Sequence, residues 1–84
     1  MKVAVRFFAS LREATGCADI ALELRPDADF ALLCRELCGR LGAHALDALL
    51  AANVRVARNQ TFEQPPFALR DGDEVAFLPP VTGG

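Results

Sequence analysis

The chain of 84 residues ends in Gly83-Gly84, so we expect its last group to be a free carboxylate on a residue without a side chain. Glycine has no Cβ, and such an end can pass through a channel too narrow for other residues and present its carbonyl to a reactive group. A carboxylate is ionised at neutral pH and is therefore a poor acyl electrophile. The sequence thus predicts a tail that is itself a substrate and must first be activated, with ATP as the expected activator.

The residues before the diglycine are an apolar strand signal that runs into two prolines, followed by a valine and a threonine: Phe77, Leu78, Pro79, Pro80, Val81 and Thr82. Proline fixes φ near −65° and favours extended polyproline II geometry, which points the tail away from the body of the protein. Residues 79–84 can span roughly 20 Å at about 3.3 Å per residue. We therefore predict one domain over residues 1–78 and an extended, flexible tail over residues 79–84.

Composition excludes several classes of function. The net charge is −2 and the nine Lys and Arg residues are scattered, which argues against a nucleic-acid interface. No stretch approaches about 18 consecutive apolar residues, and the N-terminus lacks the pattern of a secretion signal. Three cysteines fit a reducing compartment better than a disulfide framework. We expect a cytoplasmic, soluble protein with no membrane contact, whose 52% apolar content leaves surface for a protein partner.

Hydrophobic periodicity predicts the elements that must hold this tail. Alternation favours strands over residues 2–8 and 18–24, joined through a helical turn over 10–15 that Gly16 ends. A helix is predicted over 30–41, with Asp29 as its N-cap and Gly42 as its end. The weaker signals are a helix over 44–52, strands over 53–58 and 74–78, and turns at 59–60 and 71–73. This order predicts an α+β fold of the β-grasp (ubiquitin-like) type, a mixed sheet packed on one main helix.

An apolar patch is expected at the root of the tail. The alternation places Phe8 and Leu78 on the face of the sheet opposite to the core. If the first and last strands are neighbours, Phe8, Ala76 and Leu78 form an uncovered patch that Phe62 extends, with Arg12 as a charged contact at its rim. Singly scattered hydrophobic residues are the alternative for the patch, and simple solvation is the alternative for Arg12. A contiguous patch beside a reaching tail favours a docking site.

The other reactive residue types give weaker signals. Cys34 and Cys38 have helical spacing, but a zinc site needs more ligands and only the distant Cys17 and His44 remain, so a buried helix face is the preferred interpretation. The acidic residues near the last turn lack the calcium-loop pattern and are interpreted as turn and edge charges: Asp71, Asp73 and Glu74. The chain has no phosphate-binding glycine-rich loop and no Ser-His-Asp set. It is therefore not expected to be catalytic alone or to bind a metal or cofactor.

Three segments resemble the small, sulfur carrier subunit of molybdopterin synthase in the MoaD/ThiS ubiquitin-like family. They are Val5–Gly16 (VRFFASLREATG), the Asn59-Gln60 turn, and Asp71–Gly84 (DGDEVAFLPPVTGG). The resemblance covers essentially the whole chain, although residues 30–41 match only in pattern. It implies a β-grasp fold and a role as sulfur carrier in molybdenum cofactor biosynthesis.

The resemblance also implies a mechanism. An ATP-dependent partner enzyme adenylates Gly84, which becomes a thiocarboxylate, and Gly83 is its slim neighbour. The tail then enters the large synthase subunit and gives its sulfur to cyclic pyranopterin monophosphate, forming the dithiolene of molybdopterin. ATP is used by the activating partner and no cofactor is bound by this chain. Large and small subunits form a heterotetramer with two copies of each, and the acid–base residues lie on the large subunit.

The family's contacts with the large subunit fall on Phe8, Arg12, Phe62 and Leu78, besides the tail residues, and Leu78 stands where another phenylalanine is common. Three other functions stay open. A ubiquitin-like modifier would attach its diglycine to lysines, and a plain interaction domain would have an inert tail. The sulfur carrier of thiamine biosynthesis shares the fold and the diglycine, but it usually lacks the Phe-Phe-Ala start and the Pro-Pro-Val-Thr approach.

Overall fold

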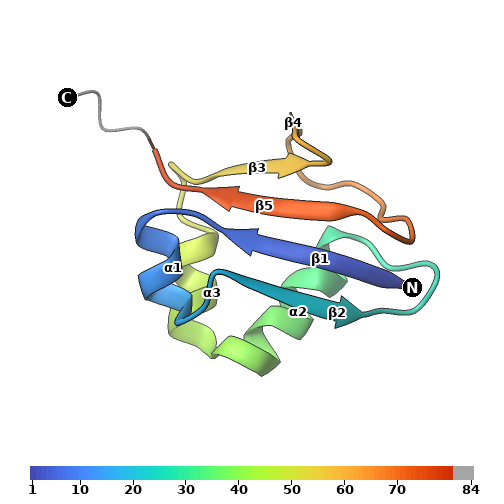
Figure 1. Cartoon of the computed structure of the whole chain (residues 1–84), viewed down its shortest axis with the longest axis horizontal. Helices are drawn as coiled ribbons and strands as arrows, with labels where there is room; N and C mark the ends of the chain where they lie inside the picture. Colours follow the sequence, from blue (N-terminus) through green and yellow to red (C-terminus); the bar gives the residue numbers. More distant parts are fainter. Residues whose placement is uncertain (81–84) are drawn as a thin grey trace.

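The computed structural model describes residues 1–80 of the chain. Its strands lie in one five-stranded sheet with the order β2-β1-β5-β3-β4 (Figure 1). They are β1 (Lys2–Phe7), β2 (Asp19–Glu23), β3 (Arg55–Arg58), β4 (Thr61–Phe62) and β5 (Glu74–Leu78). β1 and β5 run parallel, whereas the other neighbouring pairs are antiparallel. The predicted mixed sheet is confirmed, and the first and last strands are neighbours.

Helices join the strands, and their caps agree with the sequence signals. The helices are α1 (Ser10–Thr15), α2 (Phe30–Leu41) and α3 (Ala43–Leu49). The carboxylate of Asp29 accepts a hydrogen bond from the backbone N–H of Leu32 at 2.9 Å, which satisfies a free donor in the first turn of α2. Gly16 ends α1 in the left-handed conformation, with φ of 80°. Both predicted caps are confirmed.

The segment between α3 and β3 differs from the prediction at its boundaries. α3 ends at Leu49, and the backbone N–H of Val54 donates to the carbonyl of Ala51 at 3.0 Å in the turn that follows. Asn53 belongs to this turn rather than to a strand, in line with the local hydrogen bonding that makes asparagine a turn residue. β3 therefore begins only at Arg55.

One hydrophobic core fills the space between the inner face of the sheet and α2. The side chains that β1 and β5 direct inward are all buried: Val3, Val5, Phe7, Val75 and Phe77. The buried face of α2 adds Phe30, Leu33, Cys34 and Leu37. The ring centroid of Phe77 lies 6.1 Å from that of Phe7 and 6.0 Å from that of Phe30. The last strand is thus fixed to both the first strand and the main helix by aromatic packing.

A tight hairpin forms one edge of the sheet. Its turn residues, Asn59 and Gln60, have φ of 51° and 67°. Two consecutive left-handed residues are the geometry of a two-residue type I′ turn, whose twist matches that of the flanking strands. The predicted turn is confirmed, and the hairpin places Phe62 opposite Ala57 on β3.

Candidate functional site

The carboxyl ends of β1 and β5 lie at the same end of the sheet, because the two strands are parallel (Figure 1). Their register pairs Phe7 with Phe77, so the next residues, Phe8 and Leu78, lie side by side on the outer face, away from the core. The backbone N–H of Phe8 donates to the carbonyl of Phe77 at 3.2 Å. Both predicted docking side chains are half-buried, and they meet where Pro79 leaves the sheet.

Ala76 also lies on the outer face, but the expectation that it is uncovered is wrong. Only 6% of its surface is exposed. The register places it between Arg6 on β1 and Ala57 on β3, and Ala57 is buried as well. A methyl group on a central strand does not rise above longer neighbouring side chains, so Ala76 and Ala57 form the floor of the surface rather than its contact points.

Phe62 extends this surface across the sheet, as the sequence predicts. It lies opposite Ala57 on the edge strand β4, and 52% of its surface is exposed. Together with Phe8 and Leu78 it frames the alanine floor. We call these residues the outer-face patch: Phe8, Ala57, Phe62, Ala76 and Leu78.

Two arginines lie over the aromatic rings of the outer-face patch. The guanidinium carbon of Arg6 is 4.9 Å from the ring centroid of Phe8, and that of Arg55 is 3.9 Å from the ring centroid of Phe62. A guanidinium at this distance is attracted by the negative face of the ring. Sequence reasoning missed both pairs. The spacing of Arg6 and Phe8 on one strand face is a usable signal, whereas the second pair becomes visible only once β3 and β4 are paired.

The remaining predicted docking residues are less closely tied to the patch. Arg12 is exposed on α1, and within residues 1–80 its guanidinium makes no ion pair and stacks on no ring. Pro79 is half-buried and Pro80 is exposed. The other predicted tail residues lie outside the described part of the chain: Val81, Thr82, Gly83 and Gly84.

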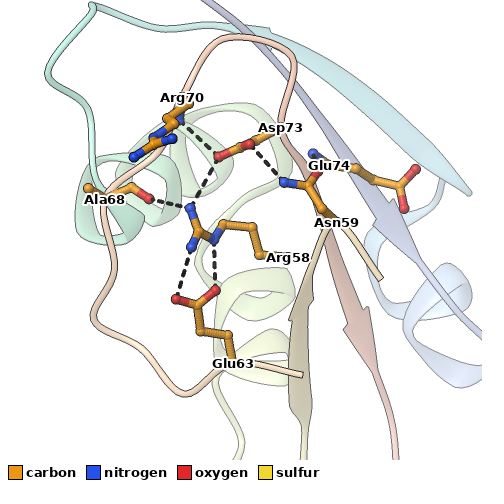
Figure 2. A network of polar contacts seen from close by, with 7 residues as sticks. All are labelled: Arg58, Asn59, Glu63, Ala68, Arg70, Asp73 and Glu74. Atoms are coloured by element: carbon orange, nitrogen blue, oxygen red, sulfur yellow. Dashed lines mark hydrogen bonds and ion pairs between the residues drawn. The ribbon is translucent and has the colours of Figure 1, made fainter. Parts of the chain in front are cut away.

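A network of polar contacts fixes the β3–β4 hairpin (Figure 2). Arg58 donates two hydrogen bonds to the carboxylate of Glu63, at 2.7 and 3.1 Å. Its guanidinium also lies 3.7 Å from the carboxylate of Asp73. Asp73 in turn accepts hydrogen bonds from the side-chain amide of Asn59 and the backbone N–H of Arg70, each at 2.9 Å. The network ties the hairpin to the loop that enters β5.

Asp73 closes the turn before β5, as predicted, because its backbone N–H donates to the carbonyl of Arg70 at 3.1 Å, and only 6% of its surface is exposed. Burial by itself would raise the pKa of this carboxyl. The hydrogen bonds from Asn59 and Arg70 and the charge of Arg58 outweigh burial, and the pKa of Asp73 is lowered from its ordinary value. The hydrogen bond to Glu63 raises the pKa of Arg58. These groups are charged and mutually satisfied, so they hold structure rather than reactive protons.

The cysteines belong to the framework of the fold. Cys34 is buried in the face of α2 that packs on the sheet, as expected, and burial raises the pKa of its thiol to about 11. Cys38 is half-buried. Within the described residues no group of three or more His, Cys, Asp or Glu side chains is placed to hold a metal ion. No helix in that part of the chain is long and apolar enough to cross a membrane.

Comparison with known proteins connects this geometry to a family. The molybdopterin synthase sulfur carrier subunit of Haemophilus influenzae is 41% identical to this chain over 80 residues, which are 95% of this chain and 96% of the relative. The crystal structure of the modifier protein SAMP1 from Haloferax volcanii superimposes with a TM-score of 0.81 at 27% identity, and the match covers all of both chains.

A third match is to a complex. The chain is similar, with a TM-score of 0.67 and 25% identity over all of both chains, to a chain in the protein–protein complex of subunits 1 and 2 of the molybdopterin-converting factor from Helicobacter pylori. The likenesses confirm the ubiquitin-like β-grasp fold. Residues 5–84 match the model of the ThiS family, so the diglycine is included in the match. The chain belongs to the ThiS family.

Proposed function

We propose that this protein is the sulfur carrier subunit of a molybdopterin synthase. The observation that carries the proposal is the full-length similarity to a molybdopterin synthase sulfur carrier subunit, within a family match that runs through Gly84. The outer-face patch at the root of the tail supports it, because a carrier must dock on a partner while its end reaches a distant reaction centre. The chain supplies an activated group, and the acid–base chemistry belongs to its partners.

The proposed cycle begins at Gly84. Its carboxylate attacks the α-phosphate of ATP on an adenylating partner, which forms an acyl-adenylate and releases pyrophosphate. A hydrosulfide nucleophile then attacks the acyl carbon and displaces AMP, and the product is a thiocarboxylate. In the large synthase subunit the thiocarboxylate sulfur bonds to cyclic pyranopterin monophosphate, and water cleaves the acyl–sulfur bond, which returns Gly84 to a carboxylate. Because the dithiolene of molybdopterin holds two sulfur atoms, two charged carriers are consumed for each product molecule. Activation is required because the free carboxylate resists nucleophilic attack.

The fold positions the tail and the docking surface, and it supplies no catalytic group. The tail continues from β5, which lies between β1 and β3 in the sheet and is buried along its inner face. A central strand is a rigid base for a reaching segment, and Phe8 and Leu78 of the outer-face patch lie beside the point where Pro79 and Pro80 begin. The complex of the Helicobacter pylori subunits supports a large-subunit partner. We propose in addition that an adenylating enzyme is the second partner of this chain, and that the two synthase subunits form a heterotetramer with two copies of each.

A protein modifier is the second candidate, and the structural likeness to SAMP1 favours it. Such a modifier requires the same activation of its diglycine, but the acyl group ends on a lysine amine. The two functions therefore differ in the acceptor and not in the first step. The specific similarity to molybdopterin synthase subunits places the carrier function first.

Variants that shift the terminal carboxylate by one residue test the proposal. Deleting Gly84, or adding one alanine after it, should abolish formation of molybdopterin in a reconstituted assay with the large subunit and the activating system. Binding to the large subunit and the unfolding midpoint should stay near those of the natural chain, because both changes leave residues 1–80 unaltered. The exchange Arg25→Gln, on an exposed loop residue, is the matched control for activity. Full product formation by the extended chain would refute the carrier function.

A further inference from the structure

A groove of about 480 Å³ lies beside the outer-face patch, between the end of α3, the start of β3 and the segment that follows β4. Two large hydrophobic side chains within residues 1–80 are at least half exposed, Leu50 at 50% and Phe62 at 52%, and both line this groove. Hydrophobic residues that are exposed without function are scattered singly over a surface. Their meeting in one hollow marks the groove as a candidate binding surface.

The rim of the groove carries one uncompensated positive charge. Arg55 and Glu63 both line it. Glu63 is neutralised by Arg58, which donates two hydrogen bonds to its carboxylate. Arg55 has no such partner: within residues 1–80 its guanidinium forms no ion pair and lies 3.9 Å over the ring of Phe62. The stacked guanidinium is already oriented, so it loses less freedom when it binds an anion.

We propose that this groove is a second part of the docking site for the large synthase subunit, where an aliphatic side chain of that subunit packs between Leu50 and Phe62 and a carboxylate of the same segment pairs with Arg55. The inference rests on the proposed function. The two surfaces are continuous, because Phe62 belongs to both the outer-face patch and the groove. The planar fork of an arginine matches a carboxylate with two parallel hydrogen bonds, which makes an acidic residue the fitting partner.

Titration calorimetry with the complete chain and the purified large subunit tests this surface. Leu50→Gln and Arg55→Gln should each raise the dissociation constant by about fivefold or more, because each removes either a central apolar contact or a paired charge from the interface. Arg55→Gln should also flatten the dependence of binding on salt, since one screened ion pair is gone. Ala31→Gln introduces the same glutamine at an exposed position of α2, and Arg25→Gln removes the charge of an exposed arginine in a loop; both should leave the constant unchanged.

The outcomes separate this inference from the proposed function. The reference variant Phe8→Asp places a charge in the outer-face patch and should weaken binding strongly. If it does while both groove variants bind normally, the docking surface ends at the patch and the groove proposal is wrong. If the groove variants lose affinity only for the adenylating enzyme, assignment to the large subunit is wrong. Failure of the unaltered chain to bind the large subunit would overturn the proposed function and this inference together.

Discussion

At the scale of single residues, the buried carboxylate of Asp73 stabilises the β3–β4 hairpin, which carries Phe62. It accepts hydrogen bonds from Asn59 and from the backbone of Arg70, and it faces the guanidinium of Arg58 (Figure 2). A buried charge is stable only when its partners satisfy it. Phe62 belongs to both the outer-face patch and the groove. The hairpin that carries it is therefore held by the carboxylate of Asp73, which lines neither surface.

Asp73→Asn should lower the free energy of unfolding by about 1–3 kcal/mol at neutral pH, because an NH2 donor replaces one of the two accepting oxygens and the charge that faces Arg58 is lost. The native pKa of Asp73 lies below its unfolded value. Its contribution is consequently complete above the unfolded pKa of about 3.9 and is lost as the pH falls through the native pKa. Urea unfolding between about pH 7 and about pH 3 should show the two proteins converging.

The control for this exchange is Asp27→Asn, which alters an exposed carboxylate that, among residues 1–80, is paired only with Arg25. Exposed ion pairs contribute about 0–1 kcal/mol, so this variant should stay close to the natural chain at every pH. A difference between natural chain and Asp73→Asn that remained constant down to acidic pH would show that the charge of Asp73 is not what stabilises the hairpin.

At the scale of elements, the β3–β4 hairpin stores local strain in its turn. Gln60 has φ of 67°, a region where a residue with a Cβ is unfavourable by about 1–2 kcal/mol. Gln60→Gly creates the Asn-Gly pair preferred in type I′ turns, and the flexibility of glycine in the unfolded chain offsets part of the gain. We expect a net stabilisation of about 0.5–1 kcal/mol in denaturant unfolding.

Gln64→Gly is the matched comparison, because Gln64 is exposed near the same hairpin and its φ is not positive. This exchange should leave stability unchanged or lower it, since it adds only flexibility to the unfolded chain. Equal effects of the two exchanges would mean that the turn conformation is not the source of the strain.

The same elements show how far the sequence predicts the structure. The helix at α2 and the strands β1, β2 and β5 follow from local periodicity and caps, which act within a few residues. The helix predicted over residues 44–52 ends already at Leu49, because the turn at Asn53 competes with a weak helical signal. The sequence predicted Phe8 beside Leu78 only if the first and last strands were neighbours, and local patterns do not determine the order of strands in a sheet.

What the sequence missed at the site depends on contacts between distant segments. Alternation gives the face of Ala76 but not its burial, which comes from its neighbours on β1 and β3. The stacking of Arg55 on Phe62 and the groove that includes Leu50 exist only after α3, β3 and β4 have come together. Burial of Asp73 follows in the same way from the approach of the loop before β5 to the hairpin.

At the scale of the whole molecule, the core lies on one side of the sheet, and the outer-face patch, which we propose as a docking surface, lies on the other. The inner face and α2 hold the core, and the outer face carries Phe8, Phe62 and Leu78 with two stacked arginines. Substitutions on the outer face can therefore change partner binding while the core is intact. Pro79 and Pro80 continue directly from β5 beside this patch, which in the proposed function couples docking to delivery of the terminal group.

In the proposed function, the chain leaves its activating enzyme with sulfur bonded to the terminal carbonyl of Gly84. The most direct test is the intact mass of the protein after incubation with the adenylating enzyme, ATP and a sulfur source. We predict a gain of about 16 Da, the replacement of one carboxylate oxygen by sulfur, and no gain in the chain that lacks Gly84. An unchanged mass, or lysine-linked conjugates in place of the thiocarboxylate, would contradict the account.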